Sequence, residues 1–520
     1  MPPTSPAAGP VGYAWIRDHL GLPSFLGPRE ARIANVNSIE RSPEGSLRIP
    51  RALVPEAALL AHILFALKHE DLNLHLLARA LREVPADDLI TAFAATPNGV
   101  YIRQACYLWE RVNTRALDRP AGANITAPYV AVFDPGIYVT GASRRSAAWR
   151  VDFNGLGDID FCPVVRHTPG IRQLLAEDLL KQVREFADKT GHAMLDRALS
   201  WAYLSETEGS FAIEGEIPSQ SKAAAFATLL KQASDSRRLT EEYLVDLQNA
   251  TVTNPLGKEV AFRSEQNRLQ KRGQRGAAGV AYVPPEPALS VELMGQLMRL
   301  ANEPPTGLDP LVHAAVLSFG FVLIHPFMDG NGRLSRFLIH HSLGQSGKLP
   351  KAFVLPVSVA MKRHEDAYLE ALSSFSRPAR ELCAVTWLGD DDYTYDWKPG
   401  ADLAFRTMDL TACVEFTLQM AKVALEQDLL RETRFLADFD RVYRKIDDRF
   451  DVRGTDLSNL IVFALQQEGR LSMNRRKQYG ERVQAEALDA IEVEVQACLA
   501  ERVESQPLED KVERDFIPRG

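Results

Sequence analysis

The chain has 520 residues, of which 46% are hydrophobic and 25% are charged, the composition of an ordinary globular protein. This composition excludes a fibrous or wholly disordered chain, and the formal net charge of −8 disfavours a nucleic-acid-coating protein, which needs a basic domain or stripe. The longest central apolar run, residues 316–324, is too short for a transmembrane helix, which needs about 20 apolar residues.

The N-terminus and the cysteines favour a cytoplasmic protein. No basic segment followed by an apolar segment begins the chain, so no secretory signal is visible. The five cysteines are odd in number and none are spaced as CxxC, which fits a reducing compartment and argues against a structural zinc site.

The N-terminal region mixes helical and strand patterns. Apolar residues recur three and four positions apart through residues 54–109, which predicts helices. Short strands are expected at 129–133, 137–140 and 149–153, between turn residues. Residues 1–190 are therefore expected to form an α+β accessory domain.

Helical patterns dominate the rest of the chain. The segment 311–324 is apolar on nearly all sides, which predicts a buried central helix. Other helices are expected at 290–302, 405–436 and 456–467, and loops at 272–279 and 391–400. The predicted fold class is mainly α, with a central domain at 191–390 and a C-terminal helical domain at 391–520, for which a winged helix is an alternative.

The segment that carries chemistry runs from His325 to Arg336 and reads H-P-F-M-D-G-N-G-R-L-S-R. It lies between the buried helix and an amphipathic one. Gly330 and Gly332 allow positive φ angles, so backbone N–H groups at the start of the second helix can gather around an anion. Taken singly, such residues are common in turns, caps and solvated faces.

The polar residues of this segment fit phosphate chemistry. Arg333 and Arg336 are three positions apart and together can bind several phosphate oxygens. Asp329 would repel a phosphate unless a divalent cation lay between them, and Mg²⁺ suits that place. His325 can accept a proton near neutral pH. The combination predicts phosphoryl or nucleotidyl transfer.

The segment also resembles the signature H-x-F-x-(D/E)-G-N-G-R-x-x-R of Fic (filamentation induced by cAMP) domains, at every fixed position. The resemblance implies a Fic-type helical core with a short β-hairpin flap. It also implies adenylyltransfer: AMP moves from ATP to a Ser, Thr or Tyr hydroxyl of a protein, and pyrophosphate is released.

The resemblance assigns a role to each matched residue. His325 would be the general base, Asp329 would hold Mg²⁺ (or Mn²⁺), and Arg336 would reach the γ-phosphate. The residues implied to bind ATP are Asp329, Gly330, Asn331, Gly332, Arg333, Arg336 and, as an adenine-side aromatic, Tyr368.

An upstream segment, Ser210-Phe-Ala-Ile-Glu214-Gly215, resembles the inhibitory motif (S/T)-x-x-x-E-(G/N) of the same family. The resemblance implies a helix near residues 200–215, whose Glu214 would pair with Arg336 and deny that arginine to the γ-phosphate. Ser210 and Glu214 are four positions apart and share one helix face. The alternative is an ordinary helix end capped by Gly215.

The expected flap lies around residues 275–283 and would pair with the backbone of the target protein by β-augmentation. Its target-binding residues would be Arg275, Gly276, Val280 and Tyr282, and the basic residues Arg268, Lys271 and Arg272 flank it.

Two alternatives to adenylyltransfer stay open at this stage. The same site could remove AMP from a modified protein. The C-terminal region, with its basic Arg475, Arg476 and Lys477, could instead belong to a nucleotide-regulated DNA-binding protein, although the surrounding tail is acidic. The expected partners are ATP and a protein target, which includes the chain itself. No DNA or membrane partner is expected, and a homodimer stays open.

Overall fold

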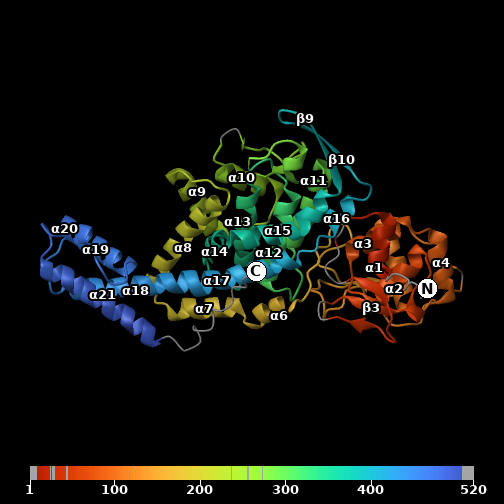
Figure 1. The fold of residues 1–520 in the computed structure, drawn as a ribbon, viewed down its shortest axis with the longest axis horizontal. Coiled ribbons are helices and arrows are strands. Elements are labelled where there is room, and N and C mark those ends of the chain that lie inside the picture. The colour runs from red at the N-terminus through yellow and green to blue at the C-terminus, as the bar shows by residue number, and fades with distance from the viewer. Residues whose placement is uncertain are drawn as a thin grey trace, which may run out of the picture. The chain divides into compact units, whose positions relative to one another are not determined.

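The computed structural model describes residues 9–505, apart from 24, 26–29, 43–44, 121, 236, 255–256 and 272. The described chain is mainly α-helical, as expected, with small sheets of two or three strands (Figure 1). It divides into two compact units, the first made of residues 1–184 and 203–422 and the second of residues 185–202 and 423–520. The division into three domains stays a prediction. Within the described part of the chain, none of the helices has the length and apolarity needed to cross a membrane.

The N-terminal part of the first unit packs helices beside two three-stranded sheets. Strand β3 (Leu47–Pro50) pairs in parallel with β1 (Ala31–Ala34) and antiparallel with β2 (Glu40–Arg41). Strand β6 (Val151–Phe153) pairs in parallel with β4 (Val130–Ala131) and antiparallel with β5 (Arg144–Ser146). The helices here are α1 (Gly12–Leu20), a 3-10 turn at Arg51–Leu53, α2 (Leu59–His69), α3 (Leu74–Glu83), α4 (Ala86–Ala95) and α5 (Val100–Asn113).

Two of the three strands expected in this region are present, in shorter form, as β4 and β6. The strand expected at 137–140 was a wrong prediction. Tyr138 makes a single bridge to Arg166, while its ring is buried against Phe133 and its hydroxyl donates to the Leu72 carbonyl. A buried aromatic residue anchoring a loop thus resembled a strand.

The larger part of the first unit is built around α12 (Pro310–Ile324), the helix expected to be buried. All of its residues except Pro310 and Val322 are buried, which confirms that expectation. Asp309 caps its start, since its carboxylate accepts hydrogen bonds from the backbone of Leu311 (2.8 Å) and Val312 (3.2 Å).

Helices surround α12 in the first unit, with α11 and α13 packed directly on it. The helices that begin or lie in this region are α6 (Pro169–Ala176), α7 (Leu179–Lys189), α8 (His192–Ile213), α9 (Gln220–Gln232), α10 (Glu241–Thr251), α11 (Pro287–Asn302), α13 (Asn331–Gln345), α14 (Val357–Arg363), α15 (Glu365–Arg380), α16 (Asp402–Arg406) and α17 (Thr411–Val423). The expected flap is a short hairpin of β7 (Leu269–Gln270) and β8 (Val280–Tyr282), joined through a 3-10 turn at Ala277–Gly279.

The loop expected at 391–400 was also a wrong prediction. Strand β9 (Cys383–Gly389) pairs antiparallel with β10 (Asp392–Trp397) in a hairpin beside the flap. Tyr393, Tyr395 and Trp397 alternate with polar residues and pack in one cluster with Val280 and Val283. This two-residue alternation was the available strand signal.

The single long helix expected at 405–436 is broken into three. Residues 408–410 leave the helix because Met408 O accepts from Val164 N and Leu410 N donates to Val164 O, both at 2.8 Å. After α17 the chain makes a π-helical turn at Ala424–Leu429 before α18 (Leu430–Asp447).

The second unit is helical around its own core, in which Val442, Ile446 and Leu460 are fully buried. It contains α18, α19 (Gly454–Gln466), α20 (Met473–Tyr479) and α21 (Ala485–Ser505). Its described residues include no strand, so the winged-helix alternative lacks a wing there. Arg476 is paired with Asp489 (2.8 Å) and Glu492 (2.5 Å), which leaves less of the basic segment for nucleic acid.

A buried polar network joins α8 to the helices on which the candidate site depends. Glu206 of α8 is 1% exposed, and its Oε1 lies 2.7 Å from His340 Nε2 of α13. Its two oxygens also accept from the hydroxyl (2.5 Å) and the backbone N–H (2.7 Å) of Ser358 in α14. This network fixes α8 against α13.

Glu206→Ala removes the acceptor of these hydrogen bonds from a site that excludes water. We expect it to lower the free energy of unfolding by roughly 2–4 kcal/mol, because the remaining buried polar groups lose their partner. Chemical denaturation measures this change, with Glu206→Gln as the control that keeps the shape and loses less. An unchanged denaturation midpoint for Glu206→Ala would show that the network does not stabilise the fold.

Candidate active site

The site is built on the turn between α12 and α13. His325 ends α12 with φ 55° and Gly330 precedes α13 with φ 86°, so the chain reverses direction between them. Asn331 holds this turn: its Nδ2 donates to Phe327 O (2.7 Å) and its Oδ1 accepts from Phe327 N (3.0 Å). Phe327 itself is fully buried against Phe262. The turn is therefore fixed before any ligand binds.

His325 is presented as a neutral base. Its Nδ1 lies 3.1 Å from the Val322 carbonyl oxygen, and because a carbonyl can only accept, Nδ1 carries the proton. Nε2 is then left with its lone pair. Burial lowers the pKa of His325 to about 4, against the opposing effects of the Val322 carbonyl and the charges of Glu214 and Asp329. The imidazole is thus neutral at neutral pH, with Nδ1 protonated and Nε2 unprotonated.

Arg336 is buried among groups of α8. It is 1% exposed, its Nε donates to Ser210 Oγ (2.9 Å), and its Nη2 donates to Ser210 O (2.7 Å) and Glu214 Oε1 (2.8 Å). The contact expected between Glu214 and Arg336 is therefore present. Nη1 of Arg336 has no hydrogen-bond partner within the described residues, so this buried donor is unused.

The end of α8 delivers Glu214 to this position. Helix α8 stops at Ile213, and Gly215, with φ 74°, turns the chain away. Burial acts to raise the pKa of the Glu214 carboxyl, but the charges and hydrogen bond of Arg336 outweigh it, so this pKa lies below the ordinary value. The segment Ser210–Gly215 is therefore both a helix end, which turns at Gly215, and the source of the carboxylate that pairs with Arg336.

Gly332 makes the approach of Glu214 feasible. A Cβ atom at residue 332 would lie 2.0 Å from Glu214 Oε1 and 3.2 Å from Arg336 Nη1. The Glu214 carboxylate therefore lies directly against the first turn of α13, where the anion site was expected.

Arg333 is held by two carboxylates, one of which the sequence analysis missed. Its side chain is 1% exposed, with Nη1 2.7 Å from Glu216 Oε2 and Nη2 3.1 Å from Asp329 Oδ1. Asp329 Oδ1 also accepts from Gly330 N at 2.5 Å. Glu216 lies two residues after Glu214. This second acidic residue, directly after the segment Ser210–Gly215, was the signal from which a carboxylate partner of Arg333 could have been expected.

Arg263 is a second residue that the sequence analysis missed. It is 3% exposed, its backbone N–H donates to Pro326 O (2.8 Å), and its Nε donates to His325 O (2.8 Å). Its Nη2 donates to Pro285 O at the base of the flap. Arg263 thus ties the flap to the turn that carries His325, and no pattern in the sequence marked it.

The other expected site residues lie in differing surroundings. Tyr368 is 6% exposed and its ring contacts Phe319 and Phe416. Burial raises its pKa to about 12, against the opposing effect of Arg336, and its adenine-side role stays a prediction. In the flap, Val280 and Tyr282 are buried, and the Tyr282 hydroxyl donates to Leu323 O at 2.7 Å. Arg275 is exposed, whereas Gly276 is buried and has φ 76°. Arg272 lies outside the described residues.

A single carboxylate is available for a metal ion at the turn. The Asp329 side chain is 44% exposed and lies at the start of α13. In the described ranges, no three His, Cys, Asp or Glu side chains gather to hold a metal ion. Such a donor set fits Mg²⁺, which proteins bind through one or two carboxylates together with the phosphates of a substrate.

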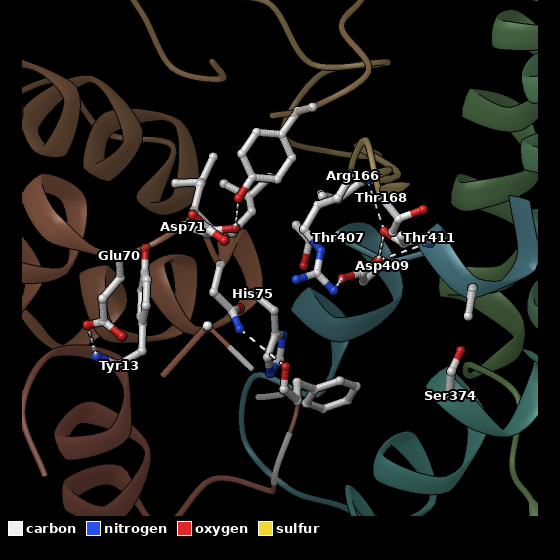
Figure 2. Close-up of a pocket in the computed structure, with 18 of the residues that line it drawn as sticks. Tyr13, Glu70, Asp71, His75, Arg166, Thr168, Ser374, Thr407, Asp409 and Thr411 are labelled. Atoms are coloured by element: carbon white, nitrogen blue, oxygen red, sulfur yellow. Dashed lines mark hydrogen bonds and ion pairs between the residues drawn. The ribbon is translucent and has the colours of Figure 1, made fainter. Parts of the chain in front are cut away.

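A separate cavity of about 390 Å³ lies elsewhere in the first unit (Figure 2). Tyr13 and Glu70 lie on one side and Arg166 and Asp409 on the other, and no residue of the turn between α12 and α13 lines it. Burial raises the pKa of Glu70 to about 8. The transfer chemistry expected from the turn therefore does not belong to this cavity.

Comparison with known proteins agrees with the geometry of the turn. The pattern of the Fic/DOC family matches residues 238–343. The chain is 30% identical over 92 residues to "Protein adenylyltransferase fic-1" of Caenorhabditis briggsae, covering 18% of each protein. It is 41% identical over 70 residues to "Protein adenylyltransferase Fic" of Drosophila yakuba, covering 13% of this chain and 14% of that protein. The chain thus spans less than a fifth of the length of these relatives.

Among solved structures, a Fic family protein from Desulfovibrio desulfuricans is similar, with a TM-score of 0.39 and 18% identity, covering 61% of this chain and 89% of that one. The family match includes the whole segment from His325 to Arg336. Residues 238–343 match the Fic/DOC family, so this part of the chain is similar to a Fic domain.

Proposed function

We propose that the chain is an autoinhibited protein adenylyltransferase, which transfers AMP from ATP to a Ser, Thr or Tyr hydroxyl of a protein. The observation that carries this proposal is the neutral His325 imidazole, with Nε2 unprotonated, beside a helix start that bears two arginines. The names of the relatives that share this segment support the same reaction.

The reaction follows from the chemistry of these groups. His325 Nε2 takes the proton of the target hydroxyl as its oxygen forms a bond to the α-phosphorus of ATP. The bond between that phosphorus and the oxygen bridging to the β-phosphate breaks, and pyrophosphate leaves. Backbone N–H groups at the start of α13, with Arg333 and Arg336, would bind the phosphate oxygens.

Asp329 is the residue that would hold Mg²⁺ or Mn²⁺, since it is the half-exposed carboxylate at the turn. The ion, when bound, would screen the negative charge of the phosphates and of the leaving pyrophosphate. In the present arrangement Asp329 Oδ1 accepts hydrogen bonds from Arg333 and Gly330 N, so a metal ion would bind through Oδ2 or compete with Arg333 for Oδ1.

Autoinhibition follows from the ion pair between Glu214 and Arg336. Glu214 occupies the guanidinium that the γ-phosphate would use, and its carboxylate would repel an incoming polyphosphate. Because the pair joins two elements of the same chain, ATP must displace an intramolecular competitor. The expected partners are ATP and a protein target, and cytoplasmic location and a homodimer stay predictions.

Removal of AMP from a modified protein is a second candidate reaction. Its motivation is that the Glu214 side chain is 35% exposed and its charge acts on His325, so this carboxylate could orient water beside the base. Incubation with an AMP-modified protein distinguishes the two reactions: release of AMP by wild type but not by Glu214→Gly would favour removal.

The central test is transfer of AMP from ATP with Mg²⁺, measured by mass spectrometry on the Glu214→Gly protein. We expect a mass gain of AMP on a hydroxyl side chain of the chain itself or of an added target. His325→Ala in the same background should lower the transfer rate by roughly 10²–10⁴-fold, because general-base catalysis is lost while the phosphate-binding groups remain. Transfer at an undiminished rate by that variant would exclude His325 as the base.

The ion pair predicts non-additive kinetics. Glu214→Gly should raise the transfer rate by at least about tenfold, since a hydrogen bond to a charged group is worth roughly 1.5–3 kcal/mol. Arg336→Ala should be inactive with or without Glu214→Gly, because the same arginine binds ATP. Labelled-AMP transfer by the four proteins measures this. A folded Glu214→Gly protein no faster than wild type would contradict autoinhibition.

The environment of His325 predicts an unusual titration. Its pKa of about 4 lies below the ordinary 6.5, so the folded state favours neutral imidazole. The corresponding stability is present above pH 6.5 and is lost as the pH falls through about 4. In NMR titrations of the histidines, the resonance that disappears in His325→Ala should have a midpoint near 4. A midpoint near 6.5 would show that Nε2 is solvated like a surface histidine.

A further inference from the structure

Glu216 holds the other arginine of the motif in the same way that Glu214 holds Arg336. Glu216 Oε2 lies 2.7 Å from Arg333 Nη1 and accepts a hydrogen bond from Thr253 Oγ1 at 3.0 Å. The Glu216 backbone N–H donates to Phe211 O at 3.1 Å, which fixes the residue at the end of α8. The carboxylate is therefore fixed from two sides before it meets Arg333.

The turn at Gly215 brings both carboxylates to the same helix start. With φ 74°, Gly215 lets Glu214 and Glu216 approach α13 from one short segment. Glu214 reaches Arg336 at 2.8 Å and Glu216 reaches Arg333 at 2.7 Å. The same segment of chain thus occupies both guanidiniums.

Arg333 contacts a second carboxylate besides that of Glu216. Its second nitrogen donates to Asp329 Oδ1 at 3.1 Å, and its guanidinium lies 5.2 Å from the centre of the Phe211 ring. Its side chain is 1% exposed, whereas that of Glu216 is 32% exposed. Glu216 is the more exposed partner of this pair and the one that incoming phosphate could displace.

The charges of this cluster bear on how many of its ion pairs must open before a polyphosphate is attracted to it. Three carboxylates, those of Glu214, Glu216 and Asp329, contact two buried guanidiniums. A polyphosphate is attracted only by positive charge that these carboxylates no longer neutralise. Loss of Glu214 frees Arg336, but Arg333 stays bonded to Glu216 and Asp329.

We propose that Glu216 is a second inhibitory positioning residue, which holds Arg333 away from ATP independently of the contact between Glu214 and Arg336. This role rests on the proposed function, because it regulates the same ATP site. A variant without Glu214 is then only partly activated. Full access of ATP to both arginines also requires that the ion pair between Glu216 and Arg333 opens.

The test measures binding of ATP with Mg²⁺ by calorimetry, using the full chain. The proteins are wild type, Glu214→Gly, Glu216→Gln and the double variant; Glu216→Gln removes the charge and keeps the shape. In the Glu214→Gly background, Glu216→Gln should tighten ATP binding by roughly three- to tenfold, the effect of one partly exposed charge near the phosphates. Transfer of AMP at subsaturating ATP should rise by a similar factor.

Two further variants control the comparison. Glu208→Gln removes one negative charge from an exposed position of α8 and should leave ATP affinity unchanged. Thr253→Val removes the hydrogen bond that fixes the Glu216 carboxylate and should shift ATP affinity in the same direction as Glu216→Gln, by a smaller factor. Thermal unfolding of each protein verifies that it is folded.

Unchanged or weaker ATP binding in the double variant, relative to Glu214→Gly, would overturn the proposal. Weaker binding would mean that Glu216 supports the productive position of Arg333 instead. If Glu214→Gly binds ATP but transfers no AMP, the proposed function fails, while the comparison of ATP affinities still decides the role of Glu216.

Discussion

Two hydrogen bonds between the Asn331 side chain and the backbone of Phe327 hold the turn on which the site depends. Without them, the positive φ angles of His325 and Gly330 would depend on the glycine, the buried Phe327 and the hydrogen bonds that Arg263 donates to residues 325 and 326. With them, the end of one buried helix and the start of the next face the same point. Together with the hydrogen bonds from Arg263, this connection sets the relative positions of the imidazole, the aspartate and the helix N-terminus.

The two motif arginines show how a site for a polyanion can exist without one. A buried guanidinium without an opposite charge is costly, so the fold needs a carboxylate partner for each whenever nucleotide is absent. Glu214 and Glu216 supply those partners from the end of α8. Under the proposed function, the stability of the empty protein and its resistance to ATP have the same physical origin.

The sequence was informative where a short segment contains all of the relevant groups. The turn from His325 to Arg336 is local, and the apolar character of α12 directly predicts its burial. Glu216 and Arg263 were missed because their partners lie far along the chain: Glu216 meets an arginine 117 positions away, and Arg263 meets a carbonyl 62 positions away. The β9–β10 hairpin was missed although Tyr393, Tyr395 and Trp397 alternate, because aspartates and a glycine around them suggested a loop. The prediction of a strand at 137–140 failed for the opposite reason. Its apolar and aromatic residues, which are typical of strands, lie in a loop that the buried Tyr138 anchors.

The absence of a side chain at Gly332 has a thermodynamic consequence. A Cβ atom at residue 332 would overlap the Glu214 carboxylate, so the missing side chain is what admits that carboxylate to the start of α13. Glu214 is in effect a tethered ligand of its own protein, present at a high local concentration set by the end of α8. Fraying of the last turn of α8 would lower that local concentration and, under the proposed function, would weaken the competition of Glu214 with ATP.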